Sequence, residues 1–419
     1  MLLFAGVRTP FCKAGTHLAK LDAVDLGRAA VAALLARTGI DPGEISEVIL
    51  GCVGQPVDAM NVARVIALRA GVPQHVPAAT VHRNCASGME ALTTAAGRLA
   101  TGHGDLFVAG GVESMSNLPF VFRQSAVEKF GKLHRARSLL TRARVLAAFR
   151  PADFTPRAGL LLGLTDPFSG LNMGETAEVL AREFDIGREE QDAFAAESHR
   201  RALTQAGALR EEIEPIALGG KPVSQDNGPR EDSTPEKLSR LRPVFDRKTG
   251  SVTAGNSSQI TDGSVALLAG SEAAGKRLGL EPIGRLVGWA YTGCDPKRMG
   301  LGPVQAIAAA NARTKLGIGD ADVIEINEAF AAQVLAVLKA LRDPEAGRRA
   351  GLDSPLGEIP LEKLNRRGGA IALGHPVGAT GARLVLTALD QLRTTGGKRA
   401  LVSLCVGGGQ GAALWLERL

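Results

Sequence analysis

The order of motifs repeats once along the chain of 419 residues, and this duplication limits the folds that the sequence can adopt. In the first half, a predicted Ala-rich helix over 26–38 leads through a Gly-Ile-Asp-Pro turn to an apolar, strand-like run at 48–51. In the second half, a predicted helix over 304–316 leads through a Gly-Ile-Gly-Asp turn to a similar run at 324–326. Helices and strands that alternate in this way predict parallel strand pairing with right-handed crossovers. The duplication therefore predicts two similar α/β halves packed together.

Each half continues with a Gly-containing turn that is predicted to open a helix, at 84–88 and at 374–378. Each half then closes with an apolar strand, at 106–110 and at 400–404. The two halves therefore agree in the order of at least four predicted elements, although the agreement is one of pattern and not of identical residues.

The region between the halves has a different character. It begins with a basic segment, 121–160, contains a pattern that predicts an amphipathic helix over 188–205, and continues with a polar stretch that contains Pro and Gly, 219–248. Long insertions in compact α/β proteins are usually functional and often cover a binding site. We therefore predict an N-terminal half (1–120), an inserted loop domain over the site (121–258) and a C-terminal half (259–419), of which residues 259–280 complete the N-terminal half.

Five cysteines are scattered along the chain and none forms a CxxC pair, so neither a disulfide framework nor a zinc ribbon is predicted. The apolar run at the N-terminus is too short for a signal peptide, and no apolar stretch is long enough to span a membrane. We therefore expect a reducing compartment, the bacterial cytoplasm.

Three short stretches each place one reactive side chain among small residues at the junction of a strand, a turn and a helix. Cys85 precedes a helical pattern, and a helix N-terminus offers unpaired N–H groups that lower the pKa of a thiol and bind an oxyanion. His375 lies in a turn whose glycines let the backbone approach a ligand closely. Cys405 ends an apolar strand before four glycines within six residues. Two cysteines and a histidine at corresponding loop ends of a duplicated fold predict a catalytic site.

Four sequence blocks, in this order, resemble the signatures of the thiolase family: His82-Arg83-Asn84-Cys85-Ala86-Ser87-Gly88, Asn327-Glu328-Ala329-Phe330-Ala331, Gly374-His375-Pro376 and Cys405-Val406-Gly407-Gly408-Gly409-Gln410-Gly411. The resemblance covers nearly the whole chain. It implies a duplicated thiolase fold, in which two similar halves with mixed sheets form five layers in the order αβαβα. It also implies an acyltransferase that moves an acyl group between coenzyme A and a cysteine.

The resemblance implies a role for each catalytic residue. Cys85 is the nucleophile that carries the acyl group as a thioester, and His375 accepts the thiol proton. Cys405 moves a proton to or from the α-carbon of the acetyl unit. One oxyanion hole combines His375 with a water molecule held by Asn327, and another uses the backbone N–H groups of Cys85 and Gly407. Coenzyme A is a substrate, and neither a metal ion nor a further cofactor is expected.

The resemblance also implies where coenzyme A lies. Arg230 matches an arginine near the nucleotide end, and Ser258 matches a serine near the pantetheine. Met299 belongs to a Met-Gly-Leu-Gly-Pro block that resembles a turn near the acyl pocket. The competing interpretations are a solvated loop charge for Arg230 and a simple turn residue for Ser258. By the same resemblance, we expect a homodimer or a dimer of dimers.

Within the family, the sequence resembles in particular the degradative 3-ketoacyl-CoA thiolases of the trifunctional-enzyme β-subunit type, through residues 225–228, 360–365 and the insertion at 121–160. Asn327 departs from that type, which typically carries His there, so membership of a multienzyme complex stays open. The predicted reaction is the CoA-dependent cleavage of 3-ketoacyl-CoA to acetyl-CoA and a shortened acyl-CoA in fatty-acid β-oxidation. The alternatives are an acetoacetyl-CoA thiolase of biosynthetic condensation and, from another class, a non-catalytic protein of this fold that binds acyl-CoA or lipid.

The basic segment 121–160 carries nine Lys and Arg residues against two acidic ones, a net charge of +7, in a chain whose total is +6. Residues 136–147 are predicted as a helix with an Ala/Leu face opposite Arg137 and Arg144. A basic amphipathic helix is typical of peripheral contact with an anionic membrane, here the inner membrane. Docking of a hydratase/dehydrogenase α-subunit, attraction of CoA phosphates and a solvated helix over the active-site mouth are the other interpretations. Nucleic acid is not expected, because the segment lacks Tyr and Trp for base stacking.

Overall fold

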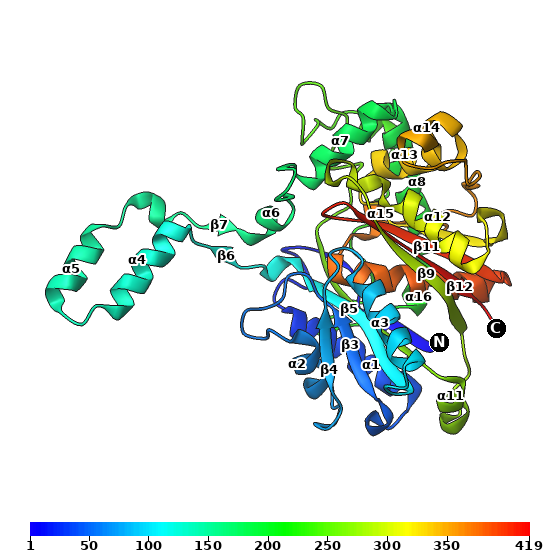
Figure 1. Cartoon of the computed structure of the whole chain (residues 1–419), viewed down its shortest axis with the longest axis horizontal. Coiled ribbons are helices and arrows are strands. Elements are labelled where there is room, and N and C mark those ends of the chain that lie inside the picture. Colours follow the sequence, from blue (N-terminus) through cyan, green and yellow to red (C-terminus); the bar gives the residue numbers. More distant parts are fainter.

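The computed structural model describes all 419 residues and contains one large mixed sheet with helices on its faces (Figure 1). Five strands of the first half pair in the order β1-β8-β5-β3-β4. Their bounds are β1 (Leu2–Arg8), β3 (Glu47–Gly51), β4 (Ala78–Val81), β5 (Leu106–Ser114) and β8 (Thr261–Gly270), with the short β2 (Cys12–Lys13) beside β8.

The strands of the second half pair in the corresponding order, β9-β12-β11-β10. Their bounds are β9 (Gly284–Gly293), β10 (Val323–Ile326), β11 (Arg399–Val406) and β12 (Gln410–Glu417). Leu364 makes an isolated parallel bridge to Ile324 in the place that β4 takes in the first half. Two residue pairs between β1 and β9, Leu2 with Arg285 and Leu3 with Gly284, join the halves into one continuous sheet.

Both halves combine the same parallel and antiparallel pairs. The predicted parallel pairing is present where β3 meets β4 and β5, and where β10 meets β11. The remaining pairs, including β11 with β12 and β12 with β9, are antiparallel. The tight turn between β11 and β12 allows no crossover, and a strand that returns directly can pair only antiparallel. The sheet is therefore mixed, as the family resemblance predicted.

The helices form three layers around the two sheet halves. Helices α1 (Ala23–Thr38) and α2 (Val62–Arg69) pack on the outer face of the first half, and α12 (Gly302–Thr314) and α13 (Ala331–Arg342) pack on that of the second. Helices α3 (Ser87–Ala100) and α16 (Val377–Thr395) lie against each other between the halves, where they share one buried apolar cluster with both. These layers confirm the predicted five-layer α/β fold.

The two central helices approach so closely that glycine is required at the crossing. A Cβ atom on Gly88 of α3 would lie 2.6 Å from the backbone nitrogen of Ala382, and one on Gly381 of α16 would lie 2.8 Å from the backbone nitrogen of Met89. The N-terminal ends of α3 and α16 therefore adjoin. Cys85 precedes the first of these ends and His375 precedes the second, so the crossing positions both side chains.

Trp415 is the largest fully buried side chain, and its indole N–H donates to Asn311 Oδ1 of α12 (2.9 Å). Replacing Trp415 by alanine leaves a cavity under α12 and an unpaired amide, and we expect the free energy of unfolding to fall by about 3–5 kcal/mol. Chemical denaturation measures this change. Trp289→Ala, at a half-buried position on the neighbouring strand, is the matched control with a smaller expected loss. A loss for Trp415→Ala no larger than that of the control would contradict this packing.

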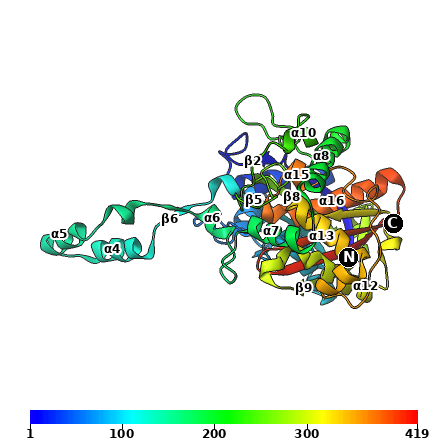
Figure 2. The ribbon, with the colours of Figure 1, turned by 90° about the horizontal axis from the view of Figure 1, so that it is seen from above.

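The insertion between the halves divides into an arm and a body portion. The arm, defined here as residues 119–163, is a helical hairpin on a two-stranded stalk that projects from the rest of the molecule (Figures 1 and 2). It comprises β6 (Phe120–Val121), α4 (Gln124–Arg135), α5 (Leu139–Ala147), η3 (Pro151–Phe154), β7 (Arg157–Ala158) and α6 (Gly159–Gly163). The helix predicted over 136–147 begins at Leu139, because Ser138 caps it, and α4 is a second helix of the basic segment. The arm stands away from the body, so a helix over the active-site mouth is not what the structure contains.

The body portion of the insertion packs against the second half. It holds α7 (Met173–Glu183), α8 (Arg188–Thr204), α9 (Ala206–Glu211) and α10 (Pro235–Leu238). The predicted helix over 188–205 is confirmed as α8, although the face that it buries is largely polar and includes Gln191, Asp192, Ser198 and His199. The remaining elements are α11 (Glu272–Leu278), α14 (Pro344–Arg349), α15 (Ala370–Leu373), η1 (Pro42–Glu44), η2 (Met115–Asn117), η4 (Pro296–Leu301) and η5 (Ile318–Asp320).

Candidate active site

Cys85 lies between β4 and the N-terminus of α3, in a turn where Asn84 takes a left-handed conformation (φ 42°). Backbone N–H groups of Gly407 and of Cys85 itself are directed at the sulfur and lower its pKa. Burial outweighs them, so the pKa of the Cys85 thiol stays above its ordinary value. The resting residue is therefore a thiol with the backbone N–H groups of Cys85 and Gly407 beside it.

The turn between β11 and β12 is fixed to the Cys85 turn across the boundary between the halves. Asn84 Nδ2 donates to the carbonyl oxygen of Gly407 (2.7 Å). Gly408 and Gly409 then follow with φ angles of 86° and 77°, a left-handed region that favours glycine. This turn aims the Gly407 N–H at the sulfur of the other half.

His375 is buried and its tautomer follows from its hydrogen bonds. The Thr380 hydroxyl donates to the carbonyl oxygen of Pro376 (3.0 Å), so it accepts from His375 Nδ1–H (2.7 Å). The opposite ring nitrogen, Nε2, therefore carries a free lone pair, and it is buried without a partner. Burial, assisted by the charge of Arg383, lowers the pKa of His375 to about 3. The imidazole is thus neutral and available as a base.

A sharp turn precedes His375. Gly374 has a φ of 99°, and a Cβ atom there would lie 2.2 Å from the Thr261 side chain of β8. The backbone N–H of His375 donates to the carbonyl oxygen of Gln259 (3.0 Å). Strand β8 of the first half and Gln259, which precedes it, therefore hold the loop that carries His375 of the second half.

Asn327 follows β10 and is completely buried, yet neither its amide nitrogen nor its side-chain oxygen has a hydrogen-bond partner. Its backbone N–H donates to the carbonyl oxygen of Ser403, which places it beside the end of β11 and Cys405. A buried amide without partners is costly, and native proteins pair such groups with water or ligand. Both polar atoms of the Asn327 side chain are therefore available to a water molecule or a ligand.

Cys405 is buried at the end of β11. Burial raises the pKa of its thiol well above the ordinary range, and the nearby Cys85 raises it further. It belongs to an apolar cluster with Met299 and Phe330, against which Met173 also packs. Cys405 is therefore a protonated thiol that borders both Cys85 and an apolar wall.

Glu113, near the end of β5, supports the site although no role was predicted for it. Its carboxylate accepts from the backbone N–H groups of Val53 (3.1 Å), Gly54 (2.7 Å) and Gly378 (2.9 Å). Burial raises its pKa to about 7, against the opposite effect of these three donors. Glu113 thereby ties the first half to the start of α16, because Gly378 lies only a few residues after His375 in the chain. A carboxylate within an otherwise apolar strand was the available signal.

Glu328 and its partners hold the second-half loops. The carboxylate of Glu328 accepts from the Ser198 hydroxyl of α8 (2.6 Å), from Asn365 Nδ2 (2.8 Å) and from the backbone N–H of Ile371 (3.3 Å). The body portion of the insertion is thus bonded to the loops that carry Asn327 and His375.

The three residues predicted near coenzyme A lie in different surroundings. Met299 is buried in the apolar cluster with Cys405. The backbone N–H of Ser258 donates to the carbonyl oxygen of Ala329 (2.9 Å), and Ala329 follows Asn327 closely in the chain. Arg230 is mostly exposed, pairs with Asp232 (3.5 Å) and borders an open cleft of about 500 Å³ against α8. Met299 thus lies beside Cys405, and Arg230 lies at the surface.

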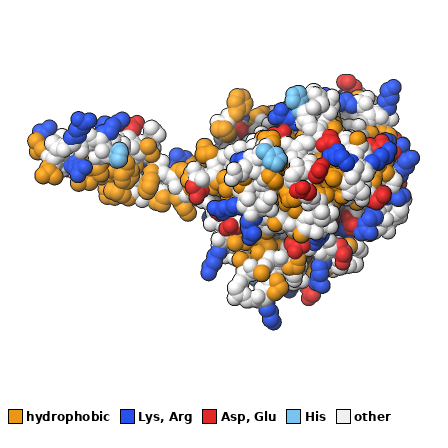
Figure 3. Space-filling view, turned by 90° about the horizontal axis from the view of Figure 1, so that it is seen from below, with side chains coloured by type: hydrophobic (Ala, Val, Ile, Leu, Met, Phe, Trp, Pro, Cys, Tyr) orange, Lys and Arg blue, Asp and Glu red, His pale blue; other side chains and the backbone are white.

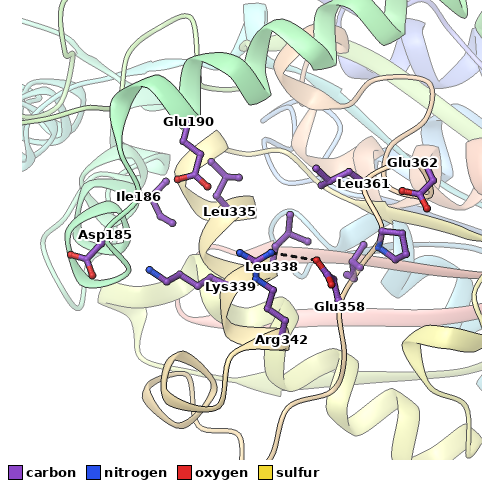
Figure 4. Close-up of a pocket in the computed structure, with 12 residues that line it drawn as sticks. Asp185, Ile186, Glu190, Leu335, Leu338, Lys339, Arg342, Glu358, Leu361 and Glu362 are labelled. Carbon is purple, nitrogen blue, oxygen red and sulfur yellow. Dashed lines mark hydrogen bonds and ion pairs between the residues drawn. The ribbon is translucent and has the colours of Figure 1, made fainter.

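A second surface cavity, of about 590 Å³, is lined by α13, the start of α8 and residues 358–362 (Figure 4). Charged side chains form its rim, where Arg342 pairs with Glu358 (3.4 Å). None of the predicted site residues lines this cavity, so it is separate from the cysteine–histidine site.

Iodoacetamide should alkylate Cys85 at a rate that rises about tenfold per pH unit between pH 6 and 8. The reason is that the pKa of Cys85 is raised and that of His375 is lowered, so the pair is thiol and imidazole, not thiolate and imidazolium. Peptide mass analysis of the modified site measures the rate. A rate that stays constant down to pH 5 would mean a preformed ion pair and would contradict these assignments.

The fold and the residues at its centre define a duplicated α/β protein with a cysteine–histidine site at the junction of its halves. The chain belongs to the thiolase family: the thiolase N-terminal domain matches residues 1–273, and the thiolase C-terminal domain matches residues 280–418. This confirms the resemblance drawn from the four sequence blocks.

Several relatives match over nearly their whole length. The chain is 40% identical to a 3-ketoacyl-CoA thiolase of Pectobacterium atrosepticum, over 99% of this chain and 95% of the relative. It is 40% identical to a probable acetyl-CoA acyltransferase of Staphylococcus aureus, over 99% and 98%. Its structure is similar to that of the Bacillus anthracis acetyl-CoA acetyltransferase (TM-score 0.87, 38% identity, 100% and 98% covered). It is also similar to human mitochondrial 3-ketoacyl-CoA thiolase in complex with CoA (TM-score 0.86, 35% identity, 100% and 98% covered).

Proposed function

We propose that this protein is a 3-ketoacyl-CoA thiolase, which uses CoA to cleave 3-ketoacyl-CoA into acetyl-CoA and a shortened acyl-CoA in fatty-acid β-oxidation. The observation that carries the proposal is the pair of buried, unpartnered polar groups at the centre of the fold, His375 Nε2 and the Asn327 amide. Together with Cys85 and Cys405, they form the set that acyl transfer through a cysteine requires. The names of the relatives agree with this class of acyltransferase.

In the first half-reaction, the Cys85 sulfur attacks the 3-keto carbon and its proton passes to His375 Nε2. The tetrahedral adduct then breaks its bond between the α-carbon and the former keto carbon. The acetyl-CoA enolate that leaves takes a proton from the Cys405 thiol, which becomes a thiolate. The products are acetyl-CoA and an acyl thioester on Cys85.

In the second half-reaction, CoA transfers its thiol proton to the Cys405 thiolate and its sulfur attacks the acyl thioester. The bond to Cys85 breaks, acyl-CoA leaves, and the Cys85 thiolate recovers the proton from protonated His375. All residues return to their initial protonation states, and no metal ion or further cofactor enters either half-reaction.

Two oxyanion holes stabilise the charged intermediates. The N–H groups of Cys85 and Gly407 hold the oxyanion on the carbon that is bonded to Cys85. The enolate oxygen of acetyl-CoA lies between His375 and a water molecule that the Asn327 amide binds. Arg230 and Ser258 contact coenzyme A, Arg230 at the cleft against α8, and Met299 borders the acyl chain.

We also propose the extent of the two halves, the oligomeric state, the cellular location and the partners. Residues 1–120 and 259–280 form one structural half, since β8 pairs with β1 and β5, and the rest of 259–419 forms the other. The body portion of the insertion covers the CoA site. The protein works as a homodimer or a dimer of dimers in the bacterial cytoplasm. An α-subunit or a membrane surface is the partner of the basic segment 121–160.

The test is the CoA-dependent loss of 3-ketoacyl-CoA absorbance with two substrates, 3-ketohexadecanoyl-CoA and acetoacetyl-CoA. The proposal expects cleavage of the long-chain substrate. Activity confined to acetoacetyl-CoA would assign the short-chain alternative, which the similarity to the Bacillus anthracis acetyl-CoA acetyltransferase favours. Lack of activity on both would overturn the catalytic proposal in favour of a binding protein.

Asn327→Ala should lower kcat about 10²–10³-fold with little change in KM, because it removes the side chain that holds the water molecule of the oxyanion hole. The melting temperature should stay close to that of the wild type, since the Asn327 side chain has no partner within the protein. Asn365→Ala is the matched control: it removes three internal hydrogen bonds, to Ile326 and Glu328, and should lower the melting temperature. A large loss of stability with unchanged kcat for Asn327→Ala would refute the assigned role.

A further inference from the structure

Arg83, two residues before Cys85, connects the turn that carries the nucleophile to the second half of the fold. Its Nε donates to the carboxylate of Glu90 in the first turn of α3 (2.5 Å). Its Nη1 donates to Oε1 of Gln410 at the start of β12 (3.3 Å). Its guanidinium lies over the ring of Tyr291 in β9, 4.2 Å from the ring centroid. One side chain therefore contacts a helix of the first half and two strands of the second.

Tyr291 is the only tyrosine of the chain, and it contacts the first half through two separate groups. Its ring lies under the Arg83 guanidinium, and a cation over an aromatic face is attracted by the quadrupole of the ring. Its hydroxyl is hydrogen-bonded to the Thr93 hydroxyl of α3 (2.8 Å). Burial raises the pKa of the Tyr291 hydroxyl, so it stays protonated at neutral pH. The contact of the ring with Arg83 and that of the hydroxyl with Thr93 can therefore be removed one at a time.

These contacts join the two turns that supply backbone N–H groups to the Cys85 sulfur. One N–H group belongs to Cys85 itself, in the turn after β4, and the other belongs to Gly407, in the turn between β11 and β12. The two turns are connected twice, by Asn84 Nδ2 with the Gly407 carbonyl oxygen (2.7 Å) and by Arg83 with Gln410 (3.3 Å). The separation of the two N–H groups therefore depends on contacts that cross the boundary between the halves.

We propose that Arg83 is a positioning residue for the reaction at Cys85. Together with Tyr291 and Gln410, it holds the two turns at the separation at which the N–H groups of Cys85 and Gly407 face one oxygen atom. An oxyanion hole stabilises charge because its donors are already in place when the charge develops, and a displacement of about 1 Å can lower the rate about 10²-fold. This role rests on the proposed acyl transfer through Cys85, and Arg83 itself has no contact with the substrate.

The competing interpretation is an ordinary ion pair at the surface. Charged side chains of both signs are spread over the body of the protein, in contrast to the apolar side chains that gather along the arm (Figure 3). Arg98 of α3 and Glu47 form such a pair within the first half (3.4 Å), and pairs of this kind contribute little. Arg83 differs because its side chain is only 31% exposed, lies over an aromatic ring and contacts the other half. These differences favour a role in the geometry of the site.

The experiment compares Arg83→Leu and Tyr291→Leu with the wild-type enzyme in two assays. Steady-state kinetics, with whichever of 3-ketohexadecanoyl-CoA and acetoacetyl-CoA the wild type cleaves, gives kcat and KM. Alkylation of Cys85 by iodoacetamide at pH 7 reports on the thiol without any substrate. Both variants should lower kcat about tenfold and change KM less than about twofold. Both should also slow alkylation about threefold or more, because the Gly407 N–H that lowers the pKa of the thiol is no longer held in place.

Two further variants are the controls. Tyr291→Phe keeps the ring under Arg83 and loses only the hydrogen bond to Thr93, so it should keep at least about half of the wild-type kcat. Arg98→Leu removes an ion pair from the same helix without a change at the other half, and it should match the wild type in both assays. Thermal denaturation checks that every variant is folded.

Wild-type values of kcat and of the alkylation rate in Arg83→Leu would overturn the positioning role. Equal losses of kcat in Tyr291→Phe and Tyr291→Leu would also overturn it, because the ring under Arg83 would then have no effect of its own. A wild-type enzyme that cleaves neither substrate would contradict the proposed function. In that case, slower alkylation of Arg83→Leu would still support the positioning role, and an unchanged alkylation rate would overturn it.

Discussion

Replacing Cys85 by alanine should lower the rate of 3-ketoacyl-CoA cleavage by at least about 10⁴-fold, because it removes the thiol that carries the acyl chain as a thioester. The thiol makes no hydrogen bond that the fold depends on, since the donors that face it belong to the backbone of Cys85 and Gly407. The variant should therefore fold and bind CoA as the wild type does. Steady-state thiolysis measures the rate, and calorimetric titration measures CoA binding.

Cys294→Ala is the control for Cys85→Ala. Cys294 is also a half-buried cysteine and lies near Cys405, but burial raises its pKa to about 11 and its sulfur contacts only the Met299 carbonyl oxygen at 4.0 Å. Its loss should change the rate about twofold at most. If the two alanine variants lost activity to a similar extent, Cys85 would not be the nucleophile.

His375→Ala should lower kcat by about 10²–10⁴-fold, the range for removal of a general base. The neutral ring with a free Nε2 is the form that accepts the Cys85 proton, and a neighbouring thiolate raises the pKa of the imidazole as it forms. The variant also loses one donor of the enolate oxyanion hole, so the decrease in kcat should lie toward the upper end of this range. Rapid-quench measurement of acyl transfer to the enzyme separates this step from product release.

Two substitutions of Thr380, which accepts the hydrogen bond from His375, are the controls for His375→Ala. Thr380→Val keeps the side-chain shape but removes the acceptor for Nδ1–H, and it should lower kcat about tenfold. Thr380→Ser should restore most of the activity, because it restores the hydroxyl. A Thr380→Val enzyme with full activity would show that the hydrogen bond to Thr380 does not set the tautomer of His375.

Much of the fold and the site was predictable because the chemistry lies in short local signals. The duplicated order of helices and strands predicted two related halves, and the structure contains the same strand order in each. Cys85, His375 and Cys405 stand next to Gly-containing turns at the ends of elements, where a local pattern marks them. Their convergence follows from the duplication, since equivalent loop ends of two packed halves face each other.

Other parts of the site depend on hydrogen bonds that a residue pattern does not specify. Glu113 acts through the backbone N–H of Gly378 in the other half, and Thr380 acts through the ring of His375. The direction in which the arm projects could not be predicted either. A basic amphipathic helix has the same sequence pattern whether it packs on the body or projects from it. The close approach of Gly88 to Ala382 is likewise a property of helix crossing that the sequence does not express.

The most direct test of this account is the intact mass of the enzyme after incubation with a saturated acyl-CoA in the absence of free CoA. We expect a mass increase equal to one acyl group, located by peptide mapping on Cys85, removed by added CoA and absent from Cys85→Ala. A stable acyl adduct on Cys294 or Cys405 instead, or no adduct on the wild-type enzyme, would contradict the central claim that Cys85 carries the acyl group.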